Sequence, residues 1–547
     1  CYFNLGVALE ACGKPSDAYD AFFKSTWSAE TQSAGFYWLS NLSARKGAYE
    51  EALGFAENAL IRNWHNMKAR ALTAALLRKL HRDNRPLIEE SLSIDPLYMG
   101  CLYEKALADR ELPAWKRHMR SEAHNYLELA LDYVKAGFYE DARTILKCCE
   151  DTNPMRSYYL GWISSLSAEI EQAADYYKTA ESSPFDCCFP NRVEEIAILK
   201  SAINILEEAP MAHYYLGCLL YDKKQYDAAI GHWEHTAAGK PFFAAVWRNL
   251  SIACYNKQRR PEKAMELMEK ACALDAAYPR LWLEYDQLAA KRNISVKKRL
   301  AVMESHPDIT AARDDLYLRY ITLLNCDGRH EEALTALKSR SFHPWEGAEG
   351  KAISQYRFAL IRIAKTKLSK GDYSAALKLL QDTLIYPANL GEGKLPNVHD
   401  NEAHYYIGLT YKYMQDPASA ENYFTLASQG SGKPSDVQYY NDQSSDYIYY
   451  QGLAYKELGS ADAAKKSFHQ LITYGKSHWF DEITDDFFAV SLPELEVFQE
   501  DMRLKHEQYC RYLCALGNLG LGNKEEADKL FKEILDRQAD YQGAIGL

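Results

Sequence analysis

The chain has 547 residues, of which 47% are apolar and 25% are charged, and its formal net charge is −11 at pH 7. This length exceeds the size at which one hydrophobic core keeps growing, so we expect several domains or an array of repeats. The mild acidity, with no basic run and no basic helix face, argues against a general binder of nucleic acid or of anionic membranes. No apolar run approaches the ~18 residues of a membrane span, so membrane insertion is not expected.

The 13 cysteines are scattered and lack the spacing of a disulfide framework. They fit a reducing compartment, and we therefore expect a cytoplasmic location. No stretch resembles a signal peptide. The first residues, Cys1 to Gly6, already match the interior of a repeat helix, so we expect the natural protein to begin earlier.

The first of three predicted segments, residues 1–123, holds helical repeats that are partly degenerate. Residues 1–64 are expected to form two helix pairs, each with a small residue on its second helix. A third pair over 66–100 departs further from the pattern. Residues 101–123 fit it poorly and form either a divergent repeat or a bend.

The second segment, residues 124–345, holds the clearest repeat at 210–241. Apolar residues there share one face of each of two helices, and Pro241 ends the second helix. Small residues at Gly217 and Ala229 let the helices approach closely, while large neighbours fill the space around that contact. The sequence predicts a helical hairpin with an apolar face too large to stand alone.

An extra element at about 190–208 precedes this repeat. Asn191 is expected to cap its helix, because an Asn side chain can accept a hydrogen bond from the first helical N–H groups. The apolar face of that helix is expected to contain Val193, Ile196, Ile203 and Leu206.

The repeat at 210–241 is about 34 residues long and resembles the tetratricopeptide repeat in its period and in its order of small and large residues. One copy cannot bury its own apolar face, so the pattern requires neighbours. Roughly a dozen copies are recognisable, several with a turn glycine five residues before the small residue. The small residues are Ala18, Ala52, Ala142, Ala173, Ala229, Ala264, Ala333, Ala376, Ala420, Ala464 and Ala527, and the glycines are Gly13, Gly47, Gly137, Gly328, Gly371, Gly459 and Gly522. The resemblance implies an all-α solenoid that forms a right-handed superhelix.

The third segment, residues 346–547, contains repeats joined by longer, Gly-rich polar links. Each link follows a second helix, so the links are expected to project from one edge of the solenoid. A solenoid does not need carboxylates, amides and aromatic rings in such links, whereas a binding edge does. The candidate ligand-binding residues are Trp345, Glu346, Glu349, Glu392, Lys394, Tyr440, Asn441 and Asp442. The alternative is that each link is a turn whose polar side chains bond local backbone.

Aromatic residues of the first helices form a second candidate surface on the concave side of the array. Rings offer apolar area and hydroxyl groups at small entropic cost, which suits peptides or sugars. The rings are Tyr158, Trp162, Tyr214, Tyr221, Tyr405 and Tyr449. The alternative is that these rings merely pack against the adjoining repeat.

Several catalytic and metal motifs fail. His330 begins a zinc-protease-like helix, but Leu334 stands where the second His ligand must be. The sequence at 430–434 lacks the first Gly and the Ser/Thr of a phosphate loop. His506, Cys510 and Cys514 share a helix face, but Cys514 occupies a core position. No catalytic residue, metal or cofactor is therefore predicted.

The link sequences resemble signature stretches of a bacterial family in which a tetratricopeptide array follows an N-terminal β-rich domain of unknown function. These stretches are FHPWEGAEGK, NLGEGK, YYND, YYQGL and FAVSLPE, together with CFPNR at 188–192. The resemblance covers residues from about 124 to the end. It implies that polar residues form either a contact with that domain or a ligand site, with networks that fix the repeat stacking as the alternative. These residues are Asn191, Arg192, Glu234, Arg248, Asp286, Arg313 and Asp314.

The sequence thus predicts a non-catalytic docking scaffold whose partners are a protein or peptide and the β-rich domain absent from this chain. The alternative is the helical half of a carbohydrate-active enzyme or a glycan-binding protein. In that case Glu346, Glu349, Glu392 or Asp442 would supply acid/base chemistry, which requires carboxylates about 5–10 Å apart at one cavity.

Overall fold

The structure is a computed structural model that describes residues 1–343, 348–396, 398–435, 443–483 and 497–545. Within those ranges the chain forms 31 α-helices and one 3-10 helix and no β-strand, so the all-α prediction is confirmed. The helices divide into two compact units, Cys1–Phe242 and Phe243–Leu547. The division into three segments made from repeat texture stays a prediction.

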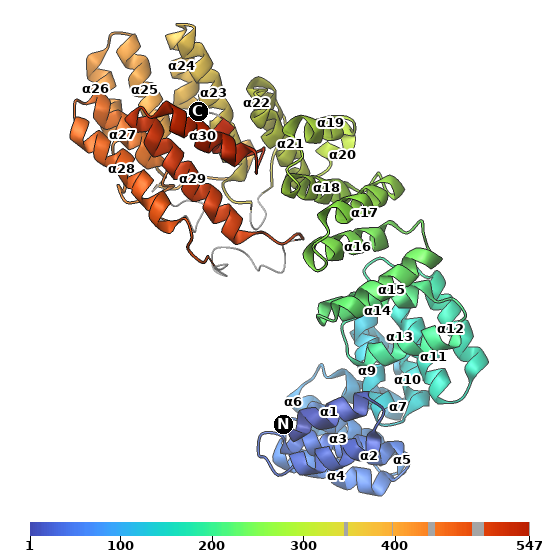
Figure 1. Ribbon diagram of the computed structural model, residues 1–547. Coiled ribbons are helices and arrows are strands. Elements are labelled where there is room, and N and C mark those ends of the chain that lie inside the picture. The colour runs from blue at the N-terminus through green and yellow to red at the C-terminus, as the bar shows by residue number, and fades with distance from the viewer. Residues whose placement is uncertain (344–347, 397, 436–442, 484–496, 546–547) are drawn as a thin grey trace. The chain divides into compact units, whose positions relative to one another are not determined.

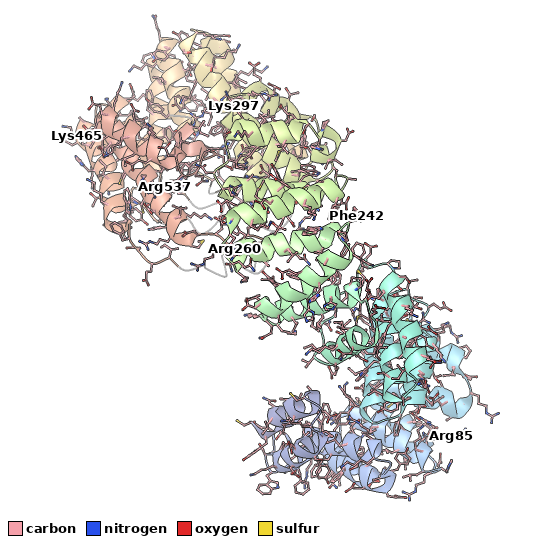
Figure 2. The ribbon with its side chains drawn as sticks, turned by 45° about the vertical axis from the view of Figure 1, so that its right-hand side comes forward. Arg85, Phe242, Arg260, Lys297, Lys465 and Arg537 are labelled. Atoms are coloured by element: carbon pink, nitrogen blue, oxygen red, sulfur yellow. The ribbon has the colours of Figure 1, made fainter. Side chains whose placement is uncertain are left out.

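Unit 1 ends at Phe242, whose side chain is 86% exposed and is labelled in Figure 2. Its helices, coloured blue to green in Figure 1, are α1 (Tyr2–Ala11), α2 (Pro15–Ser25), α3 (Gln32–Arg45), α4 (Tyr49–Arg62), α5 (Met67–Lys79), α6 (Arg85–Ile94), α7 (Met99–Asp109), α8 (Leu112–Met119), α9 (Ala123–Lys135), α10 (Tyr139–Lys147), α11 (Pro154–Leu166), α12 (Ile170–Ser182), α13 (Glu194–Ile205), α14 (Pro210–Asp222) and α15 (Tyr226–Gly239).

Unit 2 contains the remaining helices, coloured green to red in Figure 1. They are α16 (Ala244–Asn256), α17 (Pro261–Leu274), α18 (Pro279–Lys291), α19 (Val296–Glu304), α20 (Pro307–Ala311), α21 (Asp314–Cys326), α22 (His330–Lys338), α23 (Lys351–Ser369), α24 (Tyr373–Asp382), the 3-10 helix η1 (Ala388–Leu390), α25 (Asn401–Tyr413), α26 (Pro417–Ala427), α27 (Tyr447–Glu457), α28 (Ala461–His478), α29 (Met502–Leu521), α30 (Lys524–Leu535) and α31 (Gln542–Ile545).

Close packing of paired helices follows the predicted small residues. All eleven alanines of the repeat frame are at most 4% exposed. On the facing first helix, a glycine makes room for an aromatic ring sixteen residues later. A methyl group at Gly217 would lie 2.6 Å from Trp233, and one at Gly161 would lie 2.5 Å from Tyr177. The same relationship holds for Gly6 with Phe22, Gly408 with Phe424 and Gly452 with Phe468. The second helices therefore seat their rings directly on glycine backbone.

Eleven repeats carry one of the predicted alanines on the second helix. In each of them, the turn between the paired helices uses the left-handed backbone conformation. All seven predicted turn glycines have positive φ. The four repeats without a glycine at this position adopt the same conformation with Ala168, Lys224, Arg259 and Gln415. The turn thus keeps its geometry where glycine is absent, although a residue with a Cβ atom is strained in this conformation.

Residues 101–123 prove to be a divergent repeat rather than a bend. Helices α7 and α8 pack on each other, and Trp115 of α8 is 2% exposed. The Trp115 ring lies 5.0 Å from that of Tyr103 and 5.8 Å from that of Tyr126. Aromatic packing here replaces the small-residue contact of the other pairs.

The extra element is present as α13, which packs on α11 and α14, but two details of its prediction are wrong. The N-cap residue is Val193, and Glu195 Oε2 accepts the backbone N–H groups of Asn191 (2.7 Å) and Arg192 (2.8 Å), which precede the helix. The Asn191 side chain is exposed. The Glu195 carboxylate reaches back over the helix start, as the glutamate of a capping box does, to N–H groups that an Asn191 cap would not have bonded.

The predicted face of α13 is also shifted. The buried side chains of α13 are Glu195, Ile198, Leu199 and Ala202, whereas Val193 is exposed. Apolar residues cover most of this short helix, so their periodicity did not distinguish the inward face from the outward one.

The end of unit 2 packs back on earlier repeats of the same unit (Figure 1). Asn293, after α18, donates to the carbonyl of Asp536 (2.8 Å) and accepts the N–H of Ala539 (2.6 Å). Gln355 of α23 and Gln542 of α31 pair through their side-chain amides at 2.8 Å and 2.9 Å. Residues 536–545 therefore lie against α18 to α23.

Candidate functional site

One cavity of unit 2 is large enough for a ligand. It has a volume of about 560 Å³, is open to solvent and is lined by Asn325, Cys326, Asp327, Gly328, His330, Phe358, Arg362, Lys365, Thr366 and Ile545. We call it the α23 cavity. The cavity beside Tyr37 and Tyr98 in unit 1 holds about 20 Å³, and that beside Trp282 holds about 10 Å³. Those two volumes suffice for about one water molecule each.

Helices α22 and α23 give the α23 cavity a basic wall. His330 is the first residue of α22, and Arg362 and Lys365 follow Phe358 along α23. The Arg362 guanidinium lies 4.6 Å from the centre of the Phe358 ring, and the Lys365 ammonium lies 5.3 Å from that of Tyr406. Aromatic faces thus hold both cations in place by cation–π attraction.

Burial and mutual repulsion shift the titration of this wall. Burial and then the Arg362 charge lower the pKa of Lys365 to about 8, although Glu402 acts in the opposite direction. The same two causes lower the pKa of His330. An anion in the cavity would favour the charged form of both groups.

The other lining residues are held by hydrogen bonds. Asn325 donates to the side chain (3.0 Å) and the backbone carbonyl (3.2 Å) of Gln355. His330 Nδ1 lies 3.2 Å from Asn325 Oδ1. Burial raises the pKa of Cys326 to about 12, so its thiol stays protonated and is not a nucleophile at neutral pH. The lining thus presents fixed polar groups rather than a reactive one.

Sequence reasoning missed this wall, and its statement that no helix has a basic face is wrong. Helix α23 carries five basic side chains and no acidic one, in a chain with net charge −11. At 100° per residue, Lys351, Arg362 and Lys365 fall on one face. Net charge over the whole chain concealed this local excess.

Five of the eight candidate ligand-binding residues in the links lie outside the described residues. They are Trp345, Glu346, Tyr440, Asn441 and Asp442.

Glu392 and Glu349 come close together in the described part of the links. Both Glu392 oxygens accept the N–H of Gly350 at 2.9 Å. Burial raises the pKa of Glu392, and the charge of the exposed Glu349 raises it further. Glu392 therefore ties two links to each other.

Lys394 also holds a link in place. Its ammonium donates to Asp400 (2.6 Å) and to the carbonyl of Leu384 (3.0 Å), and Arg357 donates to the other oxygen of Asp400 (2.7 Å). These bonds are those of a local turn and its anchor. A ligand role for Lys394 stays a prediction.

The predicted concave-face rings differ in exposure. Tyr158 is fully buried and its hydroxyl donates to Glu181 (2.7 Å), and Tyr449 is also buried. Packing on neighbouring helices explains these two rings. Trp162, Tyr214, Tyr221 and Tyr405 are half-buried, so ligand contact by these four stays a prediction.

Five of the seven polar residues singled out by the family resemblance form ion pairs. Arg248 of α16 donates two hydrogen bonds of 2.6 Å to Glu284 of α18, which is fully buried. Asp286 of α18 is 2% exposed and accepts two bonds from Arg299 of α19 (2.8 Å and 2.9 Å). Networks that fix the repeat stacking account for these contacts.

Three further residues of that group are paired in the same way. Arg313 pairs with Asp315 (2.5 Å), Asp314 pairs with Arg340, and Arg192 pairs with Glu128. The Asp314 and Arg192 pairs join neighbouring elements, whereas the Arg313 pair lies within the start of α21.

The described residues contain no group of three or more His, Cys, Asp or Glu side chains placed to hold a metal ion. His506 donates to the carbonyl of His478 (2.7 Å), and Cys514 lies in the core. No helix among those ranges is long and apolar enough to cross a membrane.

The paired helices are joined by turns with positive φ, and they pack small residues against large ones. These features define a tetratricopeptide-repeat solenoid, a class used to bind proteins and peptides. The tetratricopeptide-repeat family model matches residues 214–279.

Solved structures similar to this chain include other tetratricopeptide proteins. Yeast Tom70 is 12% identical, with a TM-score of 0.29 over 99% of this chain and 93% of that one. The TPR domain of P58(IPK) is 12% identical, with a TM-score of 0.23 over 90% and 99%. YrrB, described as a TPR protein with an unusual peptide-binding site, is 16% identical, with a TM-score of 0.16 over 40% and 92%.

Proposed function

We propose that the chain is a docking scaffold that binds acidic segments of partner proteins, and that the α23 cavity receives a carboxylate of the segment. The observation that carries this proposal is the basic wall of His330, Arg362 and Lys365 around a cavity of about 560 Å³. A cavity of that size accommodates a few peptide side chains.

The charges favour an anionic ligand over a neutral one. Asp327 is the carboxylate among the lining residues, and Glu402 lies near enough to act on Lys365. The Glu402 carboxylate also accepts a hydrogen bond from Tyr450 (2.7 Å), which draws it toward α27. Guanidinium and ammonium groups that converge on one space bind carboxylates by charge-assisted hydrogen bonds.

Binding of a labelled peptide with four consecutive glutamates tests the proposal, with the all-glutamine peptide as the comparison. We expect Arg362→Gln and Lys365→Gln each to weaken binding about tenfold, since a hydrogen bond to a charged group contributes about 1.5–3 kcal/mol. Lys378→Gln is the matched control, because Lys378 is exposed on the second helix α24. Equal weakening by the control would mean that only overall charge matters, and would refute the proposal.

The family resemblance supports two further proposals. One is docking of a β-rich domain on the array. The other is glycan binding at the links, which the closeness of Glu349 and Glu392 favours. A thermal-shift screen with oligosaccharides, repeated with Trp345→Ala, tests the second. A ligand at a hundred times its dissociation constant adds about 2.7 kcal/mol, and a sugar-dependent shift that persists in the variant would count against the link site.

A further inference from the structure

Residues 497–500 of unit 2 form a short non-helical stretch that lies against α16 and α18. We call it the 497–500 segment. Asp501, which follows it, caps α29 by accepting the N–H of Leu504 (2.9 Å). The segment therefore lies on the repeats as a non-helical stretch, with bends at Val497 and Phe498, before α29 begins.

One side chain of α16 holds the backbone of this segment. Asn256 Nδ2 donates to the carbonyl of Val497 (2.8 Å), and Asn256 Oδ1 accepts the N–H of Gln499 (2.9 Å). The two bonds lie on either side of Phe498. Backbone pairing of this kind supplies affinity without reading sequence.

Phe498 supplies the side-chain recognition. It is 3% exposed, and its ring lies 5.4 Å from that of Tyr255 in an edge-on arrangement. It completes a buried cluster with Cys254, Ala264, Met265, Met268, Ala271, Cys272, Leu281, Leu288 and Ala289. Among the described residues of this cluster, Phe498 alone comes from outside 254–289. The pocket is thus built by one stretch of the array and filled by a distant residue.

The third contact is electrostatic. Lys291 at the end of α18 forms an ion pair with Glu500, two residues after the buried ring. The charges of Glu500 and Asp501, after burial, raise the pKa of Tyr255, which places both carboxylates near this surface. Helices α16, α17 and α18 therefore supply all three contacts, which are the Asn256 hydrogen bonds, the pocket for Phe498 and the charge of Lys291.

We infer that the surface of Asn256, Tyr255 and Lys291 is a peptide-binding site for non-helical segments with an apolar residue, a phenylalanine, a polar residue and an acidic residue in succession. The 497–500 segment occupies it in the free chain, and a partner protein's segment of the same pattern replaces it. Because a tethered segment competes at an effective concentration in the millimolar range, a partner present below that concentration must bind more tightly than the untethered segment does. This site shares no residue with the α23 cavity.

The test uses the full chain with Phe498→Ala and a labelled peptide of residues 497–503. We expect the peptide to bind the variant at least tenfold more tightly than the wild-type chain, in which the site is filled. Adding Asn256→Asp, which replaces a donor with a second acceptor facing the Val497 carbonyl, should abolish the gain. A peptide with alanine in place of the phenylalanine is the ligand control, and Lys378→Gln, at an exposed residue of α24, should leave the binding unchanged.

Two results would overturn the inference. One is a folded Phe498→Ala chain that binds the peptide no better than it binds the control peptide. The other is equal binding with and without Asn256→Asp. If Phe498→Ala does not fold, hydrogen exchange in the wild-type chain tests the inference instead. Excess peptide should then accelerate hydrogen exchange at the Gln499 amide at least fivefold, and unchanged exchange would refute the site.

Discussion

Arg299 and Asp540 are 241 residues apart in the chain, yet Arg299 Nη1 donates to Asp540 Oδ2 at 2.8 Å. Arg299 is almost completely buried and also pairs with Asp286, while Arg319 lies within hydrogen-bond distance of both aspartates. Two guanidinium groups thus face two carboxylates, so the buried charges balance. This group of four residues fastens the last described residues of unit 2 to α18, α19 and α21.

We expect Asp540→Ala to destabilise unit 2 by about 3 kcal/mol, because it leaves buried guanidinium charge without one of its partners. Urea unfolding gives the free energy, and hydrogen exchange at residues 539–545 should accelerate selectively. Asp528→Ala on the exposed face of α30 is the control. Unchanged exchange in the Asp540 variant would contradict this role.

The same aspartates set an acid limit. The arginines lower the pKa of Asp286 and of Asp540 although burial opposes them. A carboxyl group with a depressed pKa in the folded state contributes stability that is present above its unfolded pKa of about 3.9 and is lost as pH falls through the folded value. The group of four therefore contributes its full stability at neutral pH.

A methyl group at Gly217 should destabilise unit 1 by about 1–3 kcal/mol, the usual range for overpacking. It would lie 2.6 Å from the Trp233 indole and 3.1 Å from the carbonyl of Ala229, so both the ring and the backbone must move. Gly231→Ala on α15 is the matched control, since nothing lies within 4 Å of its new methyl. Higher helix propensity should make that control about 1 kcal/mol more stable, and thermal unfolding of the two variants should show opposite signs.

Ala168→Gly should stabilise the chain by about 0.5–1 kcal/mol. Ala168 has φ of 61°, a conformation that is unfavourable for a side chain with Cβ by roughly 1–2 kcal/mol and free for glycine. Part of the gain is offset by the larger entropy of glycine in the unfolded chain. Gly47→Ala makes the reverse change at the equivalent turn, and a loss of stability in both variants would refute the argument.

The histidine cluster of unit 1 predicts a loss of stability on mild acidification. His213 Nδ1 lies 2.8 Å from His232 Nδ1, and its ring stacks on His235 at 4.8 Å. Burial and the two neighbouring rings lower the pKa of His213 to about 4. Between pH 6.5 and 4 the unfolded chain therefore binds a proton that the folded chain does not, so stability falls as pH falls.

Urea midpoints at pH 5 and pH 7 measure this effect. The difference should be smaller in His213→Gln than in the wild-type chain, whereas the exposed His65→Gln should retain the wild-type difference. Identical pH dependence in the His213 variant and the wild-type chain would exclude the cluster as its source.

Binding of an acidic peptide at the α23 cavity should weaken above pH 8. Lys365 has a pKa of about 8, so it loses its charge there, and a bound carboxylate raises that pKa. Linkage then requires that affinity fall by up to tenfold per pH unit between the free and bound values. Titrations from pH 7 to 9.5 should show this fall in the wild-type chain and a flat profile in Lys365→Arg, because arginine remains charged.

The positions of the helix pairs could be predicted from the sequence because they depend on local packing. Ala229 and Gly217 are small since a partner helix touches them, and an alanine at the Ala229 position recurs in all eleven copies for which it was predicted. The turn conformation was readable where glycine marks it and not where Lys224 adopts it. Local rules therefore predicted the helix pairs well.

The α23 cavity was not readable, because it depends on contacts between distant parts of the chain. Ile545 reaches the cavity only because residues 536–545 pack back on α18 to α23, and no periodicity encodes that return. The structural roles of Glu392 and Lys394 were likewise hidden, since the same residues would suit either a turn or a ligand. Asn191 was assigned a cap because the reach of Glu195 back over the helix start was overlooked.

The return of residues 536–545 changes how unit 2 is expected to fold. An open array gains stability from nearest neighbours and can begin to form at any repeat. Unit 2 adds contacts between residues more than 200 positions apart, so the unit gains them only after a long loop has closed, which raises contact order and slows completion. During synthesis, α18 to α21 must wait for the last described residues before the buried Arg299 gains its second carboxylate partner.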